Sequence, residues 1–158
     1  MIDIGDEAPD FTAPLANGDV ETFTLSEHLD EAPIVLAFFP AAFTPTCTTE
    51  MCTFRDRMAN FEDIDATVYG ISVDLPYTLN EFREQNDLDF GLISDERREL
   101  IDAYGVASAF SPLDMRVAQR AVFVVDGDGT ITYRWLGDTP KQEPDYEAVR
   151  EAAATAAA

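Results

Sequence analysis

Two cysteines five positions apart, Cys47 and Cys52, are the residues of this chain best suited to covalent chemistry. Thr44 precedes Cys47 by three positions, and Pro45 follows Thr44 directly. Threonine is a favoured helix N-cap and proline is tolerated at the first helical position, so this order predicts a helix that begins at Pro45. Cys47 then lies in the first turn, where the helix dipole favours a thiolate, the nucleophilic form of cysteine. The alternative is that Cys47 is a small buried hydrophobe, a common role of free cysteine.

A buried strand and an amphipathic helix are the elements that would position Cys47. The apolar run at 34–39 has the length of a strand and stops at Pro40, and a helix is predicted over 45–61. An apolar stripe with spacings of four and three runs along this helix: Cys47, Met51, Phe54, Met58 and Phe61. A strand, loop and helix in this order place Cys47 at the carboxyl end of a strand, where open α/β sheets build their sites.

The rest of the chain alternates strand and helix patterns. A hairpin is predicted around Asn17-Gly18 and another around Asp126-Gly127-Asp128-Gly129. The predicted strands are 11–15, 20–23, 67–73, 90–93, 121–125 and 130–135, and the predicted helices are 77–85, 96–104 and 145–157, with a helical turn at 25–29. This order predicts one α/β domain over residues 1–158 with a mixed sheet.

The run from Pro40 to Cys47, Pro-x-x-x-Thr-x-x-Cys, resembles the signature of the peroxiredoxins. The opening segment Gly5-Asp6-Glu7-Ala8-Pro9-Asp10-Phe11 and the late segment from Gln119 to Asp126 extend the resemblance over most of the chain. The resemblance implies a thioredoxin-like fold, with a mixed central sheet flanked by helices and an N-terminal β-hairpin. It also implies a thiol-dependent peroxidase that reduces hydrogen peroxide or organic hydroperoxides, with Cys47 as the peroxidatic thiolate.

Four further residues receive roles from this resemblance. Arg120 opens the strand 121–125 and would stabilise the thiolate and bind a peroxide oxygen, although a surface arginine is the alternative. The Thr44 hydroxyl would contact the sulfur and the peroxide as well as cap the helix, and Pro40 would shape the loop and shield the thiolate. Glu50 would orient an arginine, and a solvated helix residue is the equal alternative.

Cys52 resembles the resolving cysteine of the Q-type (bacterioferritin-comigratory) peroxiredoxins. In an intact helix, residues i and i+5 are rotated by about 140°. Their Cα atoms are then more than about 7 Å apart, too far for a disulfide. Resolution would therefore require local unwinding. The stretch from Phe39 to Thr44 also resembles E-type enzymes, which have one cysteine and use an external thiol.

The resemblance implies that a thioredoxin-type or other thiol reductant recycles the enzyme without a bound cofactor. A disulfide oxidoreductase or redox adaptor is an alternative function, but such proteins usually carry Cys-x-x-Cys, whereas this chain has Cys-x-x-x-x-Cys. A non-enzymatic holdase is a third class of function. No spacing of histidine, cysteine or acidic residues suggests a zinc or iron site. The Asp126 segment is not a calcium-binding loop, because it has Gly137 at position 12, where an EF-hand has glutamate. His28, the single histidine, has no partner that pairs it with Cys47.

The net charge is −21, from 31 acidic and 10 basic residues. Such a field would repel nucleic acid and anionic membranes. The acids are spread along the chain, which resembles the composition of proteins from halophilic archaea, and a docking surface for a basic partner is the alternative. The acidic N-terminus does not have the pattern of a signal peptide, so we expect a cytoplasmic protein. The sequence leaves monomer and homodimer open.

Overall fold

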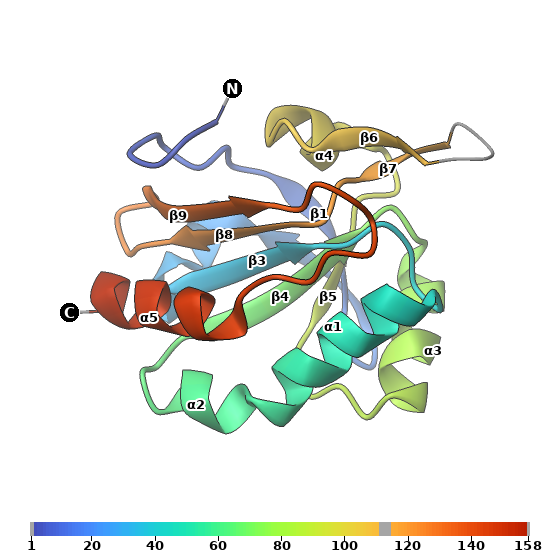
Figure 1. The fold of residues 1–158 in the computed structure, drawn as a ribbon, viewed down its shortest axis with the longest axis horizontal. Helices are drawn as coiled ribbons and strands as arrows, with labels where there is room; N and C mark the ends of the chain where they lie inside the picture. Colours follow the sequence, from blue (N-terminus) through green and yellow to red (C-terminus); the bar gives the residue numbers. More distant parts are fainter. Residues whose placement is uncertain (1, 111–114, 158) are drawn as a thin grey trace.

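The computed structural model describes residues 2–110 and 115–157 (Figure 1). Within them, seven strands form one sheet in the order β2-β1-β5-β4-β3-β8-β9. These strands are β1 (Thr12–Ala16), β2 (Val20–Thr24), β3 (Ile34–Phe38), β4 (Thr67–Ser72), β5 (Leu92–Ser94), β8 (Ala121–Val125) and β9 (Ile131–Leu136). The β3–β4 and β4–β5 pairs are parallel and the other pairs are antiparallel, so the sheet is mixed. A separate hairpin consists of β6 (Ala107–Phe110) and β7 (Met115–Ala118).

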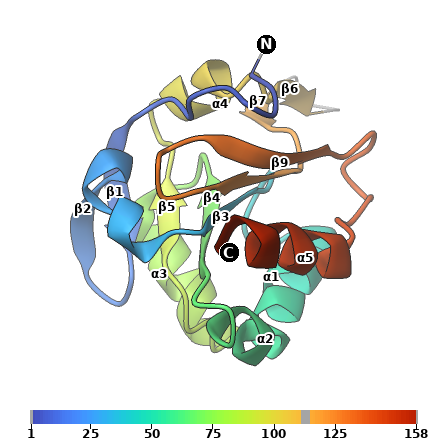
Figure 2. The same cartoon turned by 90° about the vertical axis from the view of Figure 1, so that its left-hand side faces the viewer.

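Helices cover both faces of the sheet, as Figures 1 and 2 show. The helices are α1 (Pro45–Asp56), α2 (Met58–Glu62), α3 (Pro76–Gln85), α4 (Glu99–Ala103) and α5 (Tyr146–Ala157), with two short 3-10 helices, η1 (Leu25–Glu27) and η2 (Leu29–Glu31). Helices α1, α2, α3 and α5 lie on one face, and α4 lies on the other with the β6–β7 hairpin. This is the mixed α/β sheet that the order of elements predicted, in the thioredoxin-like arrangement that the resemblance to peroxiredoxins implied.

Strand β3 is buried on both faces, and the sheet to which it belongs divides the core in two. Val35 and Ala37 pack toward the α1 side, whereas Ile34, Leu36 and Phe38 pack toward the α4 side. This alternation follows from the period of two in a strand. The predicted apolar stripe of α1 and α2 is buried against the first of these clusters, which confirms the amphipathic interpretation.

Both predicted hairpins are present, and Gly18 and Gly129 have the positive φ angles that their turns require. Other boundaries were wrong. The predicted helix 45–61 is two helices that break at Arg57, whose φ and ψ are −100° and 3°. The predicted helix 96–104 shortens to Glu99–Ala103, and the strand predicted at 90–93 begins only at Leu92. The β6–β7 hairpin was not predicted.

Candidate active site

Cys47 lies in the first turn of α1, at the carboxyl end of β3. Its side chain is almost completely buried, with 1% exposure. Thr44 occupies the N-cap position with extended backbone angles, and Pro45 is the first helical residue, as the sequence predicted. The first turn of a helix carries unpaired N–H groups and the positive end of the helix dipole, an electrostatic setting that favours negative charge.

Arg120 reaches Cys47 because of how the sheet is paired. Strand β8 runs antiparallel to β3 and places Ala121 opposite Phe38, so the residue just before β8 meets the loop that follows β3. Arg120 is 2% exposed, and its Nη2 donates a hydrogen bond to Cys47 Sγ at 3.2 Å. The same nitrogen donates to the carbonyl of Pro140 at 2.7 Å. The alternative of a surface arginine is therefore wrong.

Glu50 completes this buried cluster. Its Oε1 accepts a hydrogen bond from Arg120 Nη1 at 2.6 Å, and the carboxyl is fully buried rather than solvated. Burial raises the pKa of Glu50 to about 7, although the neighbouring Arg120 opposes this shift. Burial also acts to lower the pKa of Arg120, but the charges of Glu50 and Cys47 outweigh it and the pKa is raised. The guanidinium therefore stays charged beside the sulfur at any pH of interest.

In the described part of the chain, two buried atoms of this cluster, Glu50 Oε2 and Arg120 Nε, have no hydrogen-bond partner. Unpaired buried polar atoms cost stability, and each instance in a folded protein calls for an explanation such as a catalytic role. A cluster that served stability alone would gain from satisfying them.

The Thr44 hydroxyl does not cap α1. It donates a hydrogen bond to the carbonyl of Ala41 at 2.7 Å, and no side-chain cap is present. The prediction that this side chain caps the helix was wrong, because its hydroxyl bonds back to the preceding loop instead of accepting from an amide of the first turn. The hydroxyl oxygen can still accept a hydrogen bond from another molecule.

Pro40 is buried and lines a cavity of about 200 Å³ beside the arginine. The same cavity is lined by Arg120, Gln119, Gly137 and Pro140. Pro40 therefore lies next to the side chain that contacts the sulfur. This cavity adjoins the cluster from the side of the β6–β7 hairpin, three residues of which also line it.

Asp74 holds the loop that carries Thr44, and the sequence analysis did not single it out. It follows β4, the parallel neighbour of β3, and its Oδ2 accepts hydrogen bonds from the Ala42 amide at 2.8 Å and from Ser72 Oγ at 2.7 Å. The next residue in the loop, Phe43, has a φ of 67° and packs edge-on against Phe82. A polar residue just after a strand beside β3 was the available signal, since site residues gather at the carboxyl ends of neighbouring parallel strands.

Cys52 lies apart from this cluster. Both cysteines are free thiols, and Cys52 is partly buried against Asn86, whose Oδ1 accepts a hydrogen bond from its Sγ at 3.6 Å. The structure therefore brings together Cys47, Arg120 and Glu50 but leaves Cys52 on another face of α1, as the five-residue spacing requires.

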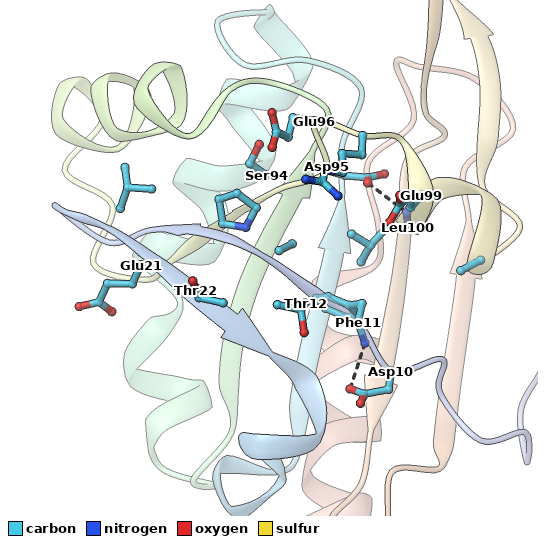
Figure 3. Close-up of a pocket in the computed structure, with 15 residues that line it drawn as sticks. Asp10, Phe11, Thr12, Glu21, Thr22, Ser94, Asp95, Glu96, Glu99 and Leu100 are labelled. Atoms are coloured by element: carbon cyan, nitrogen blue, oxygen red, sulfur yellow. Dashed lines mark hydrogen bonds between the residues drawn. The ribbon is translucent and has the colours of Figure 1, made fainter.

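A larger cavity, of about 680 Å³, lies elsewhere, between the β1–β2 hairpin and the segment leading into α4 (Figure 3). It is lined by acidic residues, including Asp10, Glu21 and Glu96, and contains no cysteine. The buried carboxylate in its wall, Asp95, already accepts hydrogen bonds from the Leu100 and Ile101 amides. The cavity offers no thiol, and we do not assign the thiol chemistry to it.

Over the described residues, no group of three histidine, cysteine or acidic side chains is arranged to hold a metal ion. No helix in residues 2–110 and 115–157 combines the length and the apolar character needed to cross a membrane.

The sequence matches the AhpC/TSA family over residues 4–134. It is 35% identical over 137 residues to the peroxiredoxin Bcp of Bacillus subtilis, an alignment that covers 85% of both chains. Among solved structures, the peroxidoxin BcpB of Mycobacterium tuberculosis superposes with a TM-score of 0.81 at 32% identity, covering 99% of this chain and 97% of that one. The C47S mutant of Xylella fastidiosa PrxQ superposes with a TM-score of 0.82 at 26% identity, covering 96% of this chain and 94% of that one.

Proposed function

Since the chain belongs to the AhpC/TSA family of peroxiredoxins and is a thiol-dependent peroxidase, we propose that Cys47 is its peroxidatic cysteine. The single observation that carries this assignment is the 3.2 Å hydrogen bond from Arg120 to the Cys47 sulfur in the first turn of α1. A buried cation and a helix N-terminus at one thiol favour the thiolate. Cys52, in the middle of the helix, lacks the helix N-terminus.

The Cys47 thiolate attacks one oxygen of the peroxide. An S–O bond forms as the O–O bond breaks, and the leaving oxygen takes a proton and departs as water or an alcohol. The sulfur is oxidised to a sulfenic acid and the peroxide is reduced. Arg120 binds a peroxide oxygen and stabilises the negative charge as it moves from sulfur to the leaving oxygen.

The surrounding residues orient the reactants. The Thr44 hydroxyl accepts a hydrogen bond from the peroxide, using the oxygen lone pairs that its contact with Ala41 leaves available. Pro40 keeps water from the thiolate. Glu50 fixes the guanidinium of Arg120 through the 2.6 Å ion pair, so that Nη2 points to the sulfur.

We propose that Cys52 then resolves the sulfenic acid by forming a disulfide with Cys47, as in Q-type peroxiredoxins, and that a thioredoxin-type donor reduces this disulfide. Helix α1 must open for this step. Its composition supports such opening, because threonines at 48, 49 and 53 donate hydrogen bonds to carbonyls four residues earlier, a pattern that weakens and bends helices. The alternative is an E-type, one-cysteine cycle in which an external thiol attacks the sulfenic acid.

Two serine variants test this function. The Cys47→Ser variant should consume no hydrogen peroxide or organic hydroperoxide. If the protein were instead a redox adaptor that acts through Cys52, this substitution would not be expected to abolish its activity. Cys52→Ser should reduce one equivalent of peroxide and then lose turnover with a thioredoxin-type donor. Normal turnover of Cys52→Ser would establish the one-cysteine cycle instead.

The charge supports a further proposal, that the protein works in a salt-rich cytoplasm such as that of a halophilic archaeon, as a monomer or a homodimer. Acidic side chains on α1, α2, α3 and the adjoining loops are solvent-exposed, including those at 56, 62, 63, 65, 81, 84 and 87. High salt shortens the range of their mutual repulsion. Binding of nucleic acid or of anionic membranes is unfavourable for such a surface.

A further inference from the structure

The thiol of Cys52 is tied to a neighbouring helix through one side chain. Asn86 follows the last residue of α3, and its Oδ1 accepts a hydrogen bond from Cys52 Sγ at 3.6 Å. The Nδ2 of the same amide donates to the carbonyl of Phe82 at 2.9 Å. The Asn86 side chain therefore bridges α1 and the end of α3.

A second contact from α1 reaches the same residue. Arg55, three positions after Cys52, donates a hydrogen bond from Nη1 to the backbone carbonyl of Asn86. The amide oxygen of Asn86 thus binds Cys52 while its backbone oxygen binds Arg55. Both contacts come from the same face of α1, since positions i and i+3 are neighbours on a helix.

These contacts hold Cys52 where it cannot react with Cys47. In the folded helix the two side chains point about 140° apart. Disulfide formation requires the turns around Cys52 to unwind, and its contact with Asn86 must break for the sulfur to move toward Cys47. The carbonyl contact to Arg55 opposes the same movement.

We propose that Asn86 is a positioning residue that acts as a latch on Cys52 and limits the rate at which the Cys47 sulfenic acid is resolved. The inference rests on the proposed role of Cys52 as the resolving cysteine. In the step concerned, the Cys52 sulfur attacks the Cys47 sulfur, the S–O bond breaks, and the oxygen leaves as water with the thiol proton. No oxidant beyond the first peroxide is needed.

The latch also sets the sensitivity to overoxidation. While Cys52 is held by Asn86, the sulfenic acid persists and a second peroxide can oxidise it to sulfinic acid. Faster release of Cys52 shortens this interval. A weaker latch should therefore lower the yield of sulfinic acid at a given peroxide concentration.

The test is Asn86→Ala in the otherwise intact chain, mixed with one equivalent of hydrogen peroxide, quenched with acid and analysed by mass spectrometry. The variant loses the acceptor for Cys52, and the thiol is a weak donor, so we expect disulfide formation to be about two- to fivefold faster, the effect of a hydrogen bond in the lower half of the usual range on an opening equilibrium. The second-order rate of Cys47 oxidation should not change. Under excess peroxide, the sulfinic fraction should fall.

Asn80→Ala is the matched control. Asn80 lies on the same helix and also makes two hydrogen bonds, but to Gly18 and Asp19 of the β1–β2 turn. The Asn80→Ala variant should form the Cys47–Cys52 disulfide at the wild-type rate. The Asn86→Asp variant retains an acceptor for Cys52 and should form the disulfide no faster than the wild type. If Asn86→Ala does not fold, Asn86→Ser takes its place in the test.

The outcomes separate the latch from the function on which it rests. If the wild type forms no Cys47–Cys52 disulfide, the resolving role of Cys52 fails and the latch fails with it. If the wild type forms the disulfide but the alanine or serine variant forms it at the same rate or more slowly, the latch is overturned while the resolving role stands.

Discussion

Replacing Arg120 by lysine should slow the oxidation of Cys47 by peroxide severely while leaving the fold intact. The guanidinium uses two nitrogens at once, Nη2 on Cys47 Sγ at 3.2 Å and Nη1 on Glu50 Oε1 at 2.6 Å. Lysine keeps the charge but has one nitrogen, and the fully buried Glu50 carboxylate competes for it. A hydrogen bond to a charged group contributes about 1.5–3 kcal/mol. At about 1.36 kcal/mol per tenfold in rate, its loss slows the reaction about 10- to 150-fold.

The assay measures the second-order loss of the Cys47 thiol by quenched flow, in a Cys52→Ser background so that resolution does not interfere. Arg116→Lys is the control, since Arg116 lies on β7 and its exposed guanidinium pairs with Asp102. This control should react as the parent does. A rate for Arg120→Lys within twofold of the parent would refute the assignment of Arg120 to the reaction.

Three further predictions concern Glu50, Asp74 and the net charge of the protein. The pKa of Glu50 is about 7 in the folded protein against an ordinary value of 4.5, so the folded protein binds this proton more tightly than the unfolded chain does. Proton binding at Glu50 therefore stabilises the fold at acid pH, and this stabilisation is lost as the pH rises from about 4.5 to about 7. Between pH 4 and 8, denaturant titrations should show the free energy of unfolding falling by about 3 kcal/mol more in the wild type than in Glu50→Gln. Asp74→Ala should lose about 1–3 kcal/mol of stability and slow Cys47 oxidation, with partial rescue by Asp74→Asn, because the Ala42 amide loses its acceptor. The unfolding midpoint should rise from low to multimolar KCl, where the Debye length is about 3 Å or less, and equal midpoints would contradict salt adaptation.

The sequence predicts those features of the site that depend on neighbouring residues in the chain, such as where a helix begins and where a strand ends. A proline at the first helical position identifies the start of α1, and therefore the turn that contains Cys47. The apolar run of β3 predicts a strand that ends just before this turn. The resemblance to peroxiredoxins then assigned Arg120, whose contact with the sulfur depends on the β3–β8 pairing.

The residues that sequence analysis missed or left open depend on packing between distant segments. Glu50 carries a charge in the buried face of α1, and only the arrival of Arg120 from β8 makes that position acceptable. Asp74 and Asn86 act through contacts to α1 and its preceding loop that lie more than thirty positions away. The strand β6 has few β-branched side chains and does not join the main sheet, so neither propensity nor alternation marks it.

The peroxidatic step and the proposed resolving step place opposite demands on α1, and the two cysteines lie on different faces of this helix. Attack on peroxide requires a fixed first turn, which the Cys47–Arg120–Glu50 cluster provides. The proposed resolution by Cys52 requires the turns around this residue to open, and on its side of the helix Cys52 and Thr53 are only partly buried and Thr53 bonds a backbone carbonyl. Because oxidation of the sulfur removes the thiolate charge, it also removes part of the attraction that holds Arg120 against the first turn. The chemical product of the first step thus weakens one of the contacts that hold the first turn of α1, so we expect opening of the helix to follow oxidation rather than precede it.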